Sequence, residues 1–473
     1  MSEKIRSLYE SGYSVPVIRE QPFDVSPWEF YQRIYSEGRY SFFLDSLHYQ
    51  PPAQRYSYIG WKPYHRVFLK NGSFQRTDLS AEMRKLFSPV RIPAEFSFDF
   101  FTGGAVGFWG YELSEAFERI SFRPKKGPRL PTLGLLFFRD IVVFDHKRER
   151  YYLISWLIPR KNIPFRKALR KAEENLIEME RALTLPSPLA LNGHFRLLRF
   201  VPEISRTDFE GMVLKAKRYI EAGDIYQANL SQRFSFNFRG SPLRLYDRLR
   251  ETNPSPFSAV LRFGDLFIAS SSPELLVAKK GRHCVTCPIA GTRPRGSNPS
   301  ETRKLAHELL TNEKERAEHL MLVDLERNDL GRVSEWRSVR VKDFMRLEKY
   351  SRVQHIVSEI ESQLKPSKDA WDLIRAMFPG GTITGCPKIR SMEIIDELEP
   401  VERGIYTGSI GYVGFDGDLM LNIAIRTLVL LGKKGYLQVG AGIVADSDPT
   451  REYEETLHKG EALAEALVQA ATV

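Results

Sequence analysis

The order of apolar and polar residues differs between the beginning of the chain and the remainder. Up to about residue 150, short runs rich in aromatic and β-branched residues are separated by turn residues, and residues 133–157 alternate around a turn at 145–148. Such runs predict the strands and hairpins of an antiparallel sheet. A charged helical run follows at 161–183, and a Pro-rich connection between 185 and 200 leads to the next block.

Helices and strands alternate after this connection. Thr207 and Glu210 have the spacing of a helix capping box, and apolar residues follow at helical spacing as far as Gly223. We expect a helix that begins at this box and leads into a strand after residue 227. The segments 103–113 and 407–419 resemble each other, which indicates two related sheets packed together.

Composition and charge fit a large globular enzyme. Of 473 residues, 42% are hydrophobic and 27% charged, and no apolar run approaches the roughly 20 residues of a membrane span. The first residues lack the apolar core of a signal peptide, so we expect a cytoplasmic protein that does not span a membrane. The net charge is +10, but the basic residues are interleaved with acidic ones along the chain, which argues against nucleic-acid binding. A basic balance also suits an enzyme that attracts a dianionic substrate.

Two acidic groups lie on predicted helices. With Thr311 as the cap, one helix carries Glu315 and Glu318 on the same face. A helix near the C-terminus presents Glu452, Glu455 and Lys459 at positions i, i+3 and i+7. Carboxylates are the oxygen donors that Mg²⁺ prefers, but solvated helix surfaces carry the same pattern, and the spacing does not show that the two helices meet.

Glu274 and two Gly/Pro-rich loops are further candidates. Glu274 follows a predicted strand and a proline, where a buried carboxyl can act as a general acid or simply as a structural cap. The loops at 288–296 and 378–392, the second of which contains Thr382, can hold carboxylates through backbone N–H groups, although each also has the composition of an ordinary turn.

Arg426 and His355 each allow two interpretations. Arg426 lies in a predicted strand that is otherwise apolar, so it needs an anionic partner, which is either a substrate carboxylate or a structural carboxylate. His355 lies at the end of another predicted strand, where a core histidine is more common than a catalytic one.

In this order, these segments resemble the chorismate-utilising enzymes, which include the large subunits of anthranilate synthase and aminodeoxychorismate synthase, with isochorismate and salicylate synthases as cousins. The resemblance is dense from 207 to 465, and FFLDS, RYSYIG and GGAVGFWGYE extend it to the N-terminal part. It implies an α/β (α+β) fold like that of anthranilate synthase component I, a large sandwich of stacked antiparallel sheets with helices outside. An N-terminal sheet-rich part (1–185) and a chorismate-binding catalytic region (200–470) would share one interleaved sandwich.

The resemblance also implies roles for individual residues. Mg²⁺ bridges to the ring carboxylate of chorismate, and Glu274 is the acid that helps the C4 hydroxyl to leave. The implied metal-site carboxylates are Glu315, Glu318, Glu452 and Glu455. The implied substrate contacts are Ala290, Gly291, Thr292, Thr382, Tyr406, Arg426, Gly440 and Lys459. His355 is placed near the ring of the substrate.

Gln227 bears on the choice of nucleophile. Isochorismate and salicylate synthases have a lysine base at the matching position, which activates water for attack at C2. Glutamine cannot act as that base, so we expect ammonia to be the nucleophile.

Other positions bear on the product, and they disagree. FLDS at 43–46, GSIGY at 408–412 and the pair Phe257 and Ser258 resemble aminodeoxychorismate synthases. Ala290 instead resembles anthranilate synthases, because many aminodeoxychorismate synthases have a lysine there that is thought to attack C2. We expect component I of an aminodeoxychorismate synthase, which serves 4-aminobenzoate and folate biosynthesis, with anthranilate synthase as the alternative. An isochorismate or salicylate synthase, or a non-catalytic ligand-binding protein, fits less well.

The cysteines indicate that ammonia comes from another protein. Cys284 and Cys287 form a CxxC in a predicted strand, and Cys386 precedes a proline in a loop. None stands in the Gly-rich strand-to-helix elbow of a glutaminase nucleophile. We therefore expect a separate glutamine amidotransferase subunit (component II) as a partner, or free ammonium as the nitrogen source.

Overall fold

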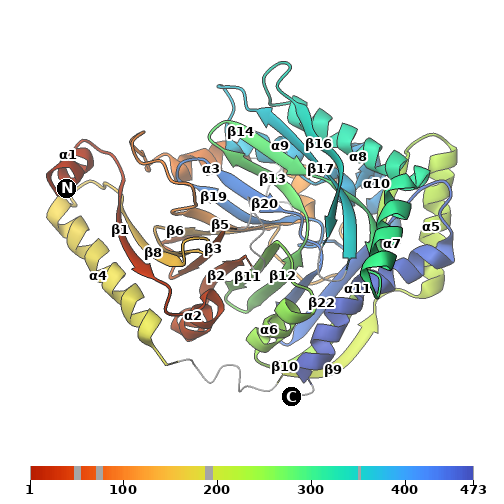
Figure 1. Ribbon diagram of the computed structural model, residues 1–473, viewed down its shortest axis with the longest axis horizontal. Coiled ribbons are helices and arrows are strands. Elements are labelled where there is room, and N and C mark those ends of the chain that lie inside the picture. Colours follow the sequence, from red (N-terminus) through yellow and green to blue (C-terminus); the bar gives the residue numbers. More distant parts are fainter. Residues whose placement is uncertain (1, 47–54, 71–77, 187–194, 350–352, 472–473) are drawn as a thin grey trace.

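Two antiparallel sheets form the centre of the protein in a computed structural model that describes residues 2–46, 55–70, 78–186, 195–349 and 353–471 (Figure 1). The larger sheet is built from β1 (Val15–Pro22), β2 (Tyr40–Asp45), β3 (Tyr56–Trp61), β7 (Asp140–Asp145), β8 (Arg150–Leu157), β9 (Phe195–Pro202), β10 (Gln227–Gly240), β11 (Phe257–Phe263), β12 (Leu266–Ser272), β18 (Gly385–Cys386), β21 (Thr427–Leu431) and β22 (Lys434–Ile443). Its order is β1-β8-β7-β3-β2-β11-β12-β21-β22-β10-β18, and β9 pairs with β10.

The smaller sheet packs against the larger one. It is built from β4 (His65–Leu69), β5 (Gly104–Trp109), β6 (Leu133–Phe138), β13 (Leu275–Lys280), β14 (His283–Cys287), β15 (Ile289–Pro294), β16 (Arg340–Lys349), β17 (Val353–Gln363), β19 (Ser409–Gly414) and β20 (Leu419–Asn422). Its order is β15-β17-β14-β13-β20-β19-β5-β6-β4, and β16 pairs with β17. In β14 burial alternates along the strand, so the predicted strand around the CxxC is confirmed.

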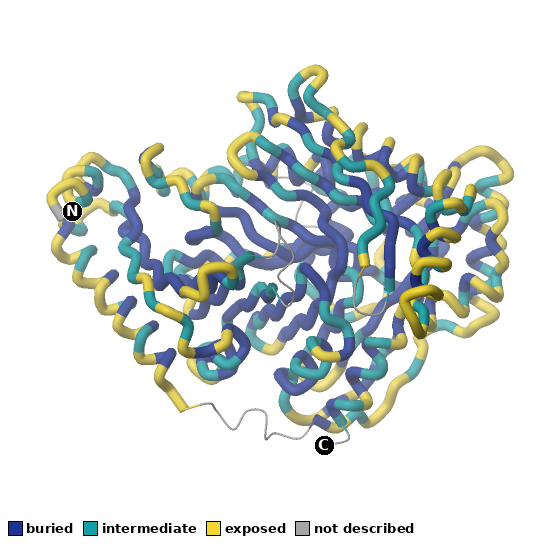
Figure 2. The backbone as a smooth tube through the Cα atoms, in the orientation of Figure 1, coloured by how far each residue is buried: buried dark blue, intermediate teal, exposed yellow. Residues whose placement is uncertain are grey.

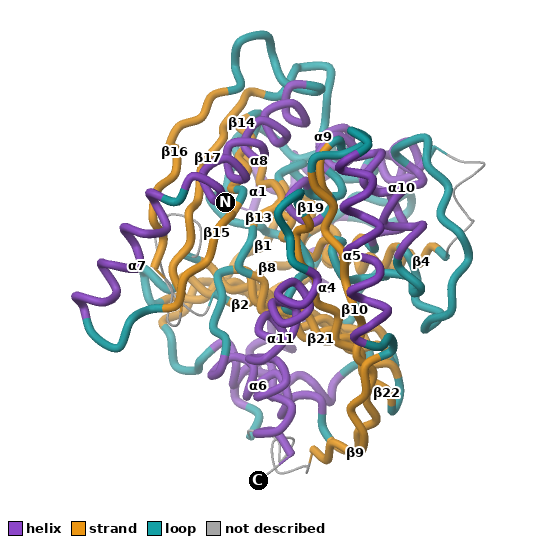
Figure 3. Tube along the Cα trace, turned by 90° about the vertical axis from the view of Figure 1, so that its right-hand side faces the viewer, coloured by secondary structure: helices purple, strands orange, loops and turns teal. Residues whose placement is uncertain are grey.

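Helices cover the outer faces of both sheets (Figures 1 and 3). They are α1 (Ser2–Glu10), α2 (Pro27–Ile34), α3 (Leu79–Phe87), α4 (Phe165–Thr184), α5 (Arg206–Glu221), α6 (Pro242–Thr252), α7 (Pro299–Thr311), α8 (Glu313–Gly331), α9 (Ala370–Met377), α10 (Lys388–Leu398) and α11 (Pro449–Ala471), with short 3₁₀ turns η1 (Tyr35–Glu37), η2 (Tyr111–Ala116) and η4 (Gly381–Ile383). In the described ranges, no helix is long and apolar enough to cross a bilayer.

Three apolar clusters hold these layers together. One fills the space between the sheets, where Val106 of β5 and Val143 of β7 belong to the same cluster. A second joins the larger sheet to α2, α4, α6 and α11, and a third joins the smaller sheet to α3, α8 and α9. Buried backbone is concentrated in the strands (Figure 2). The predicted sandwich of stacked antiparallel sheets with helices outside is therefore confirmed.

Strands from the N-terminal part and from the C-terminal part of the chain meet within each sheet. In the smaller sheet β5 pairs with β19, with Trp109 opposite Ser409 and Gly104 opposite Gly414. The similar segments 103–113 and 407–419 are thus adjacent strands of one sheet, and the prediction that they mark two packed sheets is wrong. Both segments fill the same need, a buried strand whose glycines allow close contact with neighbouring backbone. Part of the predicted boundary, 187–194, lies outside the described residues.

The helix predicted from residue 207 begins two residues earlier. Its N-cap is Ser205, whose hydroxyl accepts a hydrogen bond from the Asp208 N–H at 3.1 Å, and the Asp208 carboxylate accepts one from the Ser205 N–H in return. The capping box is therefore Ser205 with Asp208 rather than Thr207 with Glu210. Serine and aspartate satisfy the same two orphan N–H groups, so the sequence offered two overlapping boxes.

The cap of α8 is also one residue away from the prediction. Asn312 is the N-cap, and its side-chain oxygen accepts a hydrogen bond from the Glu315 N–H at 3.0 Å. Thr311 instead ends α7, where its hydroxyl donates to the His307 carbonyl at 2.8 Å. An N-cap of this kind typically stabilises a helix by about 1 kcal/mol. Capping by Asn312 places Glu315 in the first turn of α8.

Candidate active site

Glu274 lies in the short connection between β12 and β13, and its side chain is buried, with 5% of the residue exposed. The Ile289 N–H donates to Glu274 Oε1 at 3.3 Å. Burial raises the pKa of the carboxyl to about 7, and the nearby Thr382 hydroxyl, the Ile289 N–H and attraction to Arg426 and Lys459 oppose this rise only in part. Glu274 thus carries a proton near neutral pH, as a general acid must.

Arg426 lies in a bend between β20 and β21, not within a strand as predicted. Its φ is +50°, and its carbonyl accepts a hydrogen bond from the Ser271 N–H at 3.1 Å. This conformation interrupts the strand and leaves the guanidinium half-buried. The positive charge favours the ionised form of Glu274 and, after burial itself, is the largest cause that lowers the pKa of His355 to about 4. His355 is therefore a neutral imidazole near pH 7.

His355 and Thr292 face each other across β15 and β17. They are opposite one another in the register, and the Thr292 hydroxyl is 3.0 Å from His355 Nδ1. The Gly291 carbonyl lies 3.3 Å from the same nitrogen. Ala290, the preceding residue, is buried opposite Ile356. The strand pairing thus brings the predicted histidine to the predicted substrate loop.

The acidic face of α8 meets the strands through two polar contacts. Arg293 Nη1 donates to Glu315 Oε1 at 2.9 Å, and Gln227 Nε2 donates to Glu318 Oε1 at 3.1 Å. The pKa of Glu318 is raised, first by burial and then by the negative charges of Glu315 and Glu455. The carboxylates of α8 therefore lie within electrostatic range of α11, a proximity that spacing alone did not show.

On α11, the acidic face is less enclosed. Lys459 Nζ is 2.7 Å from a carboxylate oxygen of Glu455 and donates to the Gly440 carbonyl at 3.2 Å. The pKa of Glu452 is raised by burial and by the charge of Glu455, against a hydrogen bond from Ser447. Lys459 thus fixes the helix to β22 beside the carboxylates.

The charge of Lys459 affects the pKa values of groups throughout the predicted site. It lowers the pKa of Glu274, Glu318 and Glu452, and it also lowers that of His355. A single ammonium therefore connects the predicted acid, the predicted ring contact and carboxylates of both helices. These side chains form one site at the junction of β10, β15, β17, β22, α8 and α11.

The arrangement of the four glutamates decides whether they fit Mg²⁺. In the part of the chain that the structure describes, no group of three or more His, Cys, Asp or Glu side chains is close enough to hold a metal by itself. The carboxylates instead form one pair on α8 and one on α11 that repel each other, as the raised pKa of Glu318 shows. A hard divalent cation would relieve this repulsion and would take its remaining ligands from water and substrate oxygens, so the residues fit Mg²⁺.

Gly440 allows β22 to approach two polar side chains. A Cβ atom at this position would lie 2.7 Å from both Asn229 Oδ1 and the Tyr406 hydroxyl oxygen, so only glycine fits without a shift. Among the described residues, no partner reaches the buried atoms Asn229 Oδ1 and Gln227 Oε1. Both side chains come from β10 at i and i+2, hence from one face, and that alternation could have identified Asn229, which the sequence analysis missed.

The three motifs that resemble aminodeoxychorismate synthases lie together, away from the predicted catalytic residues. FLDS, the Phe257–Ser258 pair and GSIGY all contribute to one cavity of about 170 Å³, which includes Asp45, Ser46 and Tyr412. None of the predicted catalytic or metal-site residues lines it. These motifs therefore describe a single cavity outside the catalytic site and count as one observation.

Known proteins resemble this chain over most of its length. The family described as chorismate binding enzyme matches residues 23–465. Aminodeoxychorismate synthase component 1 of Bacillus subtilis (strain 168) is 43% identical over 426 residues, which cover 87% of this chain and 89% of that protein. Anthranilate synthase component 1 of Acetivibrio thermocellus is 39% identical over 488 residues, which cover 100% and 99%.

A solved structure agrees with these similarities. The crystal structure of anthranilate synthase component I from Streptococcus pneumoniae TIGR4 superimposes with a TM-score of 0.77 at 36% identity and covers 88% of this chain and 93% of that chain. The relatives divide between two names, so the comparisons leave the product open. The chain belongs to the chorismate binding enzyme family, as a chorismate-utilising enzyme of the aminodeoxychorismate and anthranilate synthase type.

Proposed function

We propose that this protein is component 1 of an aminodeoxychorismate synthase, which replaces the C4 hydroxyl of chorismate with an amino group. In this reaction the C4–O bond breaks, a C–N bond forms with ammonia, and the hydroxyl leaves as water. The product would be 4-amino-4-deoxychorismate, the precursor of 4-aminobenzoate. The 43% identity to an aminodeoxychorismate synthase component 1 supports this choice of product.

The main argument for amination rather than water addition is the glutamine at position 227. Its amide donates to Glu318 on the face of β10 that looks toward the acidic helices. A glutamine amide does not take up a proton near neutral pH, so this position offers no base for activating water. Ammonia needs no such base, because its nitrogen is already a nucleophile.

Glu274 supplies the proton that the leaving group needs. Hydroxide is a poor leaving group, and the buried carboxyl with a pKa of about 7 is protonated where a carboxyl with an ordinary pKa is not. Neutral His355 is held by Thr292 at the side of the substrate loop and adds no competing positive charge. In this proposal Arg426 and Lys459 attract the substrate carboxylates.

The metal-site proposal assigns Mg²⁺ to Glu315, Glu318, Glu452 and Glu455. A bound Mg²⁺ would neutralise the ring carboxylate of chorismate and so stabilise the electron-rich transition state. Gln227 and Arg293 orient two of these carboxylates through hydrogen bonds, which fixes the ligands before the metal arrives.

Anthranilate synthase is the second candidate, and Ala290 favours it. The resemblance implies a lysine at this position in many aminodeoxychorismate synthases, and alanine offers no amine for a covalent bond to C2. A route to aminodeoxychorismate in this chain would therefore use ammonia at C2 first, with onward transfer through water, or would use another group. The covalent lysine route forms no part of our proposal.

We also propose a glutamine amidotransferase subunit as the ammonia donor. The name component 1 belongs to relatives that are one part of a larger enzyme. Burial raises the pKa of all three thiols in this chain, to about 11 for Cys284 and to about 12 for Cys287, and it also raises the pKa of Cys386. A glutaminase nucleophile must be a thiolate near neutral pH, so none of the three is suited to release ammonia from glutamine.

Chorismate consumption by the purified chain tests the proposed function. We expect consumption with ammonium and Mg²⁺ together, and none with glutamine and Mg²⁺ until an amidotransferase subunit is added. Consumption without any nitrogen source would mean that water is the nucleophile and would contradict the proposal. Turnover with glutamine alone would contradict the need for a partner.

A further inference from the structure

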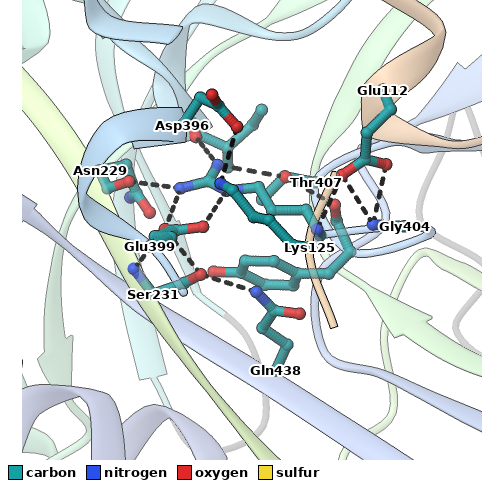
Figure 4. Close-up of polar contacts among 12 residues, drawn as sticks. Glu112, Lys125, Asn229, Ser231, Asp396, Glu399, Gly404, Thr407 and Gln438 are labelled. Atoms are coloured by element: carbon teal, nitrogen blue, oxygen red, sulfur yellow. Dashed lines mark hydrogen bonds and ion pairs between the residues drawn. The ribbon is translucent and has the colours of Figure 1, made fainter. Parts of the chain in front are cut away.

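A buried ion pair lies between α10 and the loop that leads to β19. Glu399 caps the C-terminus of α10, and Arg403 follows it by four residues. Arg403 Nη2 is 2.6 Å from Glu399 Oε1, and Arg403 Nε donates to Oε2 at 2.9 Å (Figure 4). Only 4% of Arg403 and 2% of Glu399 are exposed. The pair is therefore a bidentate ion pair that is almost fully buried.

Stability is a weak explanation for such a pair. Desolvation of two charges offsets most of their attraction, and well-packed apolar residues often replace buried pairs without loss. A functional explanation requires that the pair hold something in place, so its remaining hydrogen bonds are decisive.

The remaining donors of Arg403 hold three separate segments. Nη1 donates to the Ile383 carbonyl at 2.9 Å and to the Thr407 hydroxyl at 3.3 Å, while Nη2 donates to the Asn229 carbonyl at 2.5 Å. With the two bonds to Glu399, these contacts use all five N–H groups of the guanidinium. One side chain thus joins β10, the η4 turn and the 406–407 turn.

Glu399 and its neighbours extend the same network. One carboxylate oxygen of Glu399 accepts from the Ser231 N–H at 2.7 Å and from the Ser231 hydroxyl at 2.8 Å. Gln438 on β22 then donates to that hydroxyl at 2.8 Å. The Arg403 N–H donates to the buried carboxylate of Glu112 at 2.8 Å, which ties the loop to the N-terminal part of the chain (Figure 4).

Each held segment places a residue of the chorismate site. Asn229 lies two residues from Gln227 on the same face of β10, and Ile383 follows Thr382, which acts on the pKa of Glu274. Thr407 follows Tyr406, whose ring centre is 5.7 Å from the Arg403 guanidinium carbon and whose hydroxyl abuts Gly440. Arg403 therefore reaches the acid side and the β10 side of the site without facing the substrate itself.

We infer that Arg403, clamped by Glu399, is a positioning residue that sets the acid turn, β10 and Tyr406 relative to one another for catalysis. The inference rests on the proposed function for the roles of the residues that it positions. Lysine cannot replace this arginine, because a single ammonium cannot form a bidentate contact with Glu399 and also donate to three other oxygens.

The kinetic test compares two Arg-to-Lys variants. Arg403→Lys should lower kcat for chorismate by about 10²-fold, as a misplacement near 1 Å does, with KM changed far less. Arg55→Lys is the matched control, because Arg55 contacts Asp145 through two bonds of 2.8 and 2.5 Å in the N-terminal strands. It should lower stability without lowering kcat.

A double-mutant cycle separates positioning from stability. If Arg403 acts through the Ile383 carbonyl on Thr382, then Arg403→Lys and Thr382→Val should be non-additive in kcat, with the double variant close to the worse single variant. Additive losses, or a kcat for Arg403→Lys equal to that of the unaltered protein, would overturn the inference. Glu399→Gln, which keeps the shape of the acceptor, provides the same comparison if Arg403→Lys does not fold.

Backbone hydrogen exchange tests the inference without any activity. In Arg403→Lys, amides in 381–384 and 404–408 should exchange at least about 10-fold faster, because local opening costs less once the guanidinium is gone, while amides of β3 and β7 stay unchanged. Equal exchange in these turns would overturn the inference. If the unaltered protein consumes no chorismate, the proposed function fails, and this measurement still decides whether Arg403 positions the turns.

Discussion

Glutamate side chains face the predicted site from two regions, and the two environments differ in kind. At the sheet side, Glu274 is enclosed by β12, β13 and the 381–383 turn, and burial is the main cause that raises its pKa to about 7. On the helix side, the pKa values of Glu318 and Glu452 are raised by burial and also by neighbouring carboxylates. The side chain of Glu455 is half exposed.

The difference separates two kinds of chemistry available to one functional group. A carboxyl whose burial outweighs the attraction of nearby positive charges holds a proton and can donate it. Carboxylates that lie close enough to repel each other are the arrangement that a divalent cation stabilises. Glu274 is therefore suited to donate a proton, and the glutamates of α8 and α11 are suited to bind a metal.

Removal of the acid should have the largest effect. Glu274→Gln keeps the shape but not the acidic proton, so we expect kcat to fall by about 10² to 10⁴-fold while Mg²⁺-dependent chorismate binding is retained. Steady-state kinetics and calorimetric binding would measure the two quantities. Glu361→Gln, a partly buried carboxylate that contacts His283 on the same sheet, serves as the control. Full activity in Glu274→Gln would remove Glu274 from the acid role.

Neutralisation of a helix carboxylate should instead act on the metal. In Glu318→Gln we expect the Mg²⁺ concentration for half-maximal activity to rise by about 10²-fold. Mg²⁺ should also raise the melting temperature of the unaltered protein, since a ligand at 100 times its Kd stabilises by about 2.7 kcal/mol, and this rise should disappear in the variant. An unchanged Mg²⁺ requirement would separate α8 from the metal site.

The pH dependence should follow the sheet-side carboxyl alone. Because Glu274 must be protonated, kcat/KM for chorismate at constant free ammonia should fall about tenfold per pH unit above pH 7, and Glu274→Gln should lack this limb. His355→Asn should not move the limb, since His355 is neutral above about pH 5.

The same shift has a consequence for stability. The folded state binds the Glu274 proton more tightly than the unfolded chain, whose value is 4.5, so this group lowers the free energy of unfolding as pH rises from about 4.5 to 7. Chemical denaturation at pH 5 and pH 7 would measure the difference, which should be smaller in Glu274→Gln. An equal difference would contradict the raised pKa.

A base at residue 227 should have the smallest effect. Gln227→Lys is expected to yield a minor product from water addition at C2, because an amine near Glu318 can take the proton of water. Gln227→Met, of similar length without a base, is the control and should yield none. Mass spectrometry of the products would resolve the two, and identical profiles would count against our interpretation of Gln227.

Periodicity predicted the layers better than it predicted the ends of elements. Strand alternation and the helical face of α11 follow from burial, which the sequence encodes at each position. Helix starts depend on which of several polar residues caps first, and Ser205 and Asn312 precede the residues that we expected. Arg426 was placed in a strand because its neighbours are apolar, whereas its backbone breaks the strand.

The candidate site was only partly accessible from the sequence. Spacing identified Glu315, Glu318 and the α11 face, but not their mutual approach, which depends on the packing of both helices against β15 and β22. Arg403 drew no attention because a lone arginine in a Gly-containing loop resembles a surface residue. Its importance appears only when Asn229 and Ile383, distant in the chain, are seen on the same guanidinium.

The identity of the aminated product tests the central claim most directly. Purified protein, chorismate, Mg²⁺ and ammonium at alkaline pH would be incubated with and without an aminodeoxychorismate lyase, and the products separated and weighed by mass spectrometry. We predict 4-amino-4-deoxychorismate, which the lyase converts to 4-aminobenzoate. Fluorescent anthranilate with pyruvate would contradict this account and would show that Ala290 was the better guide to the product.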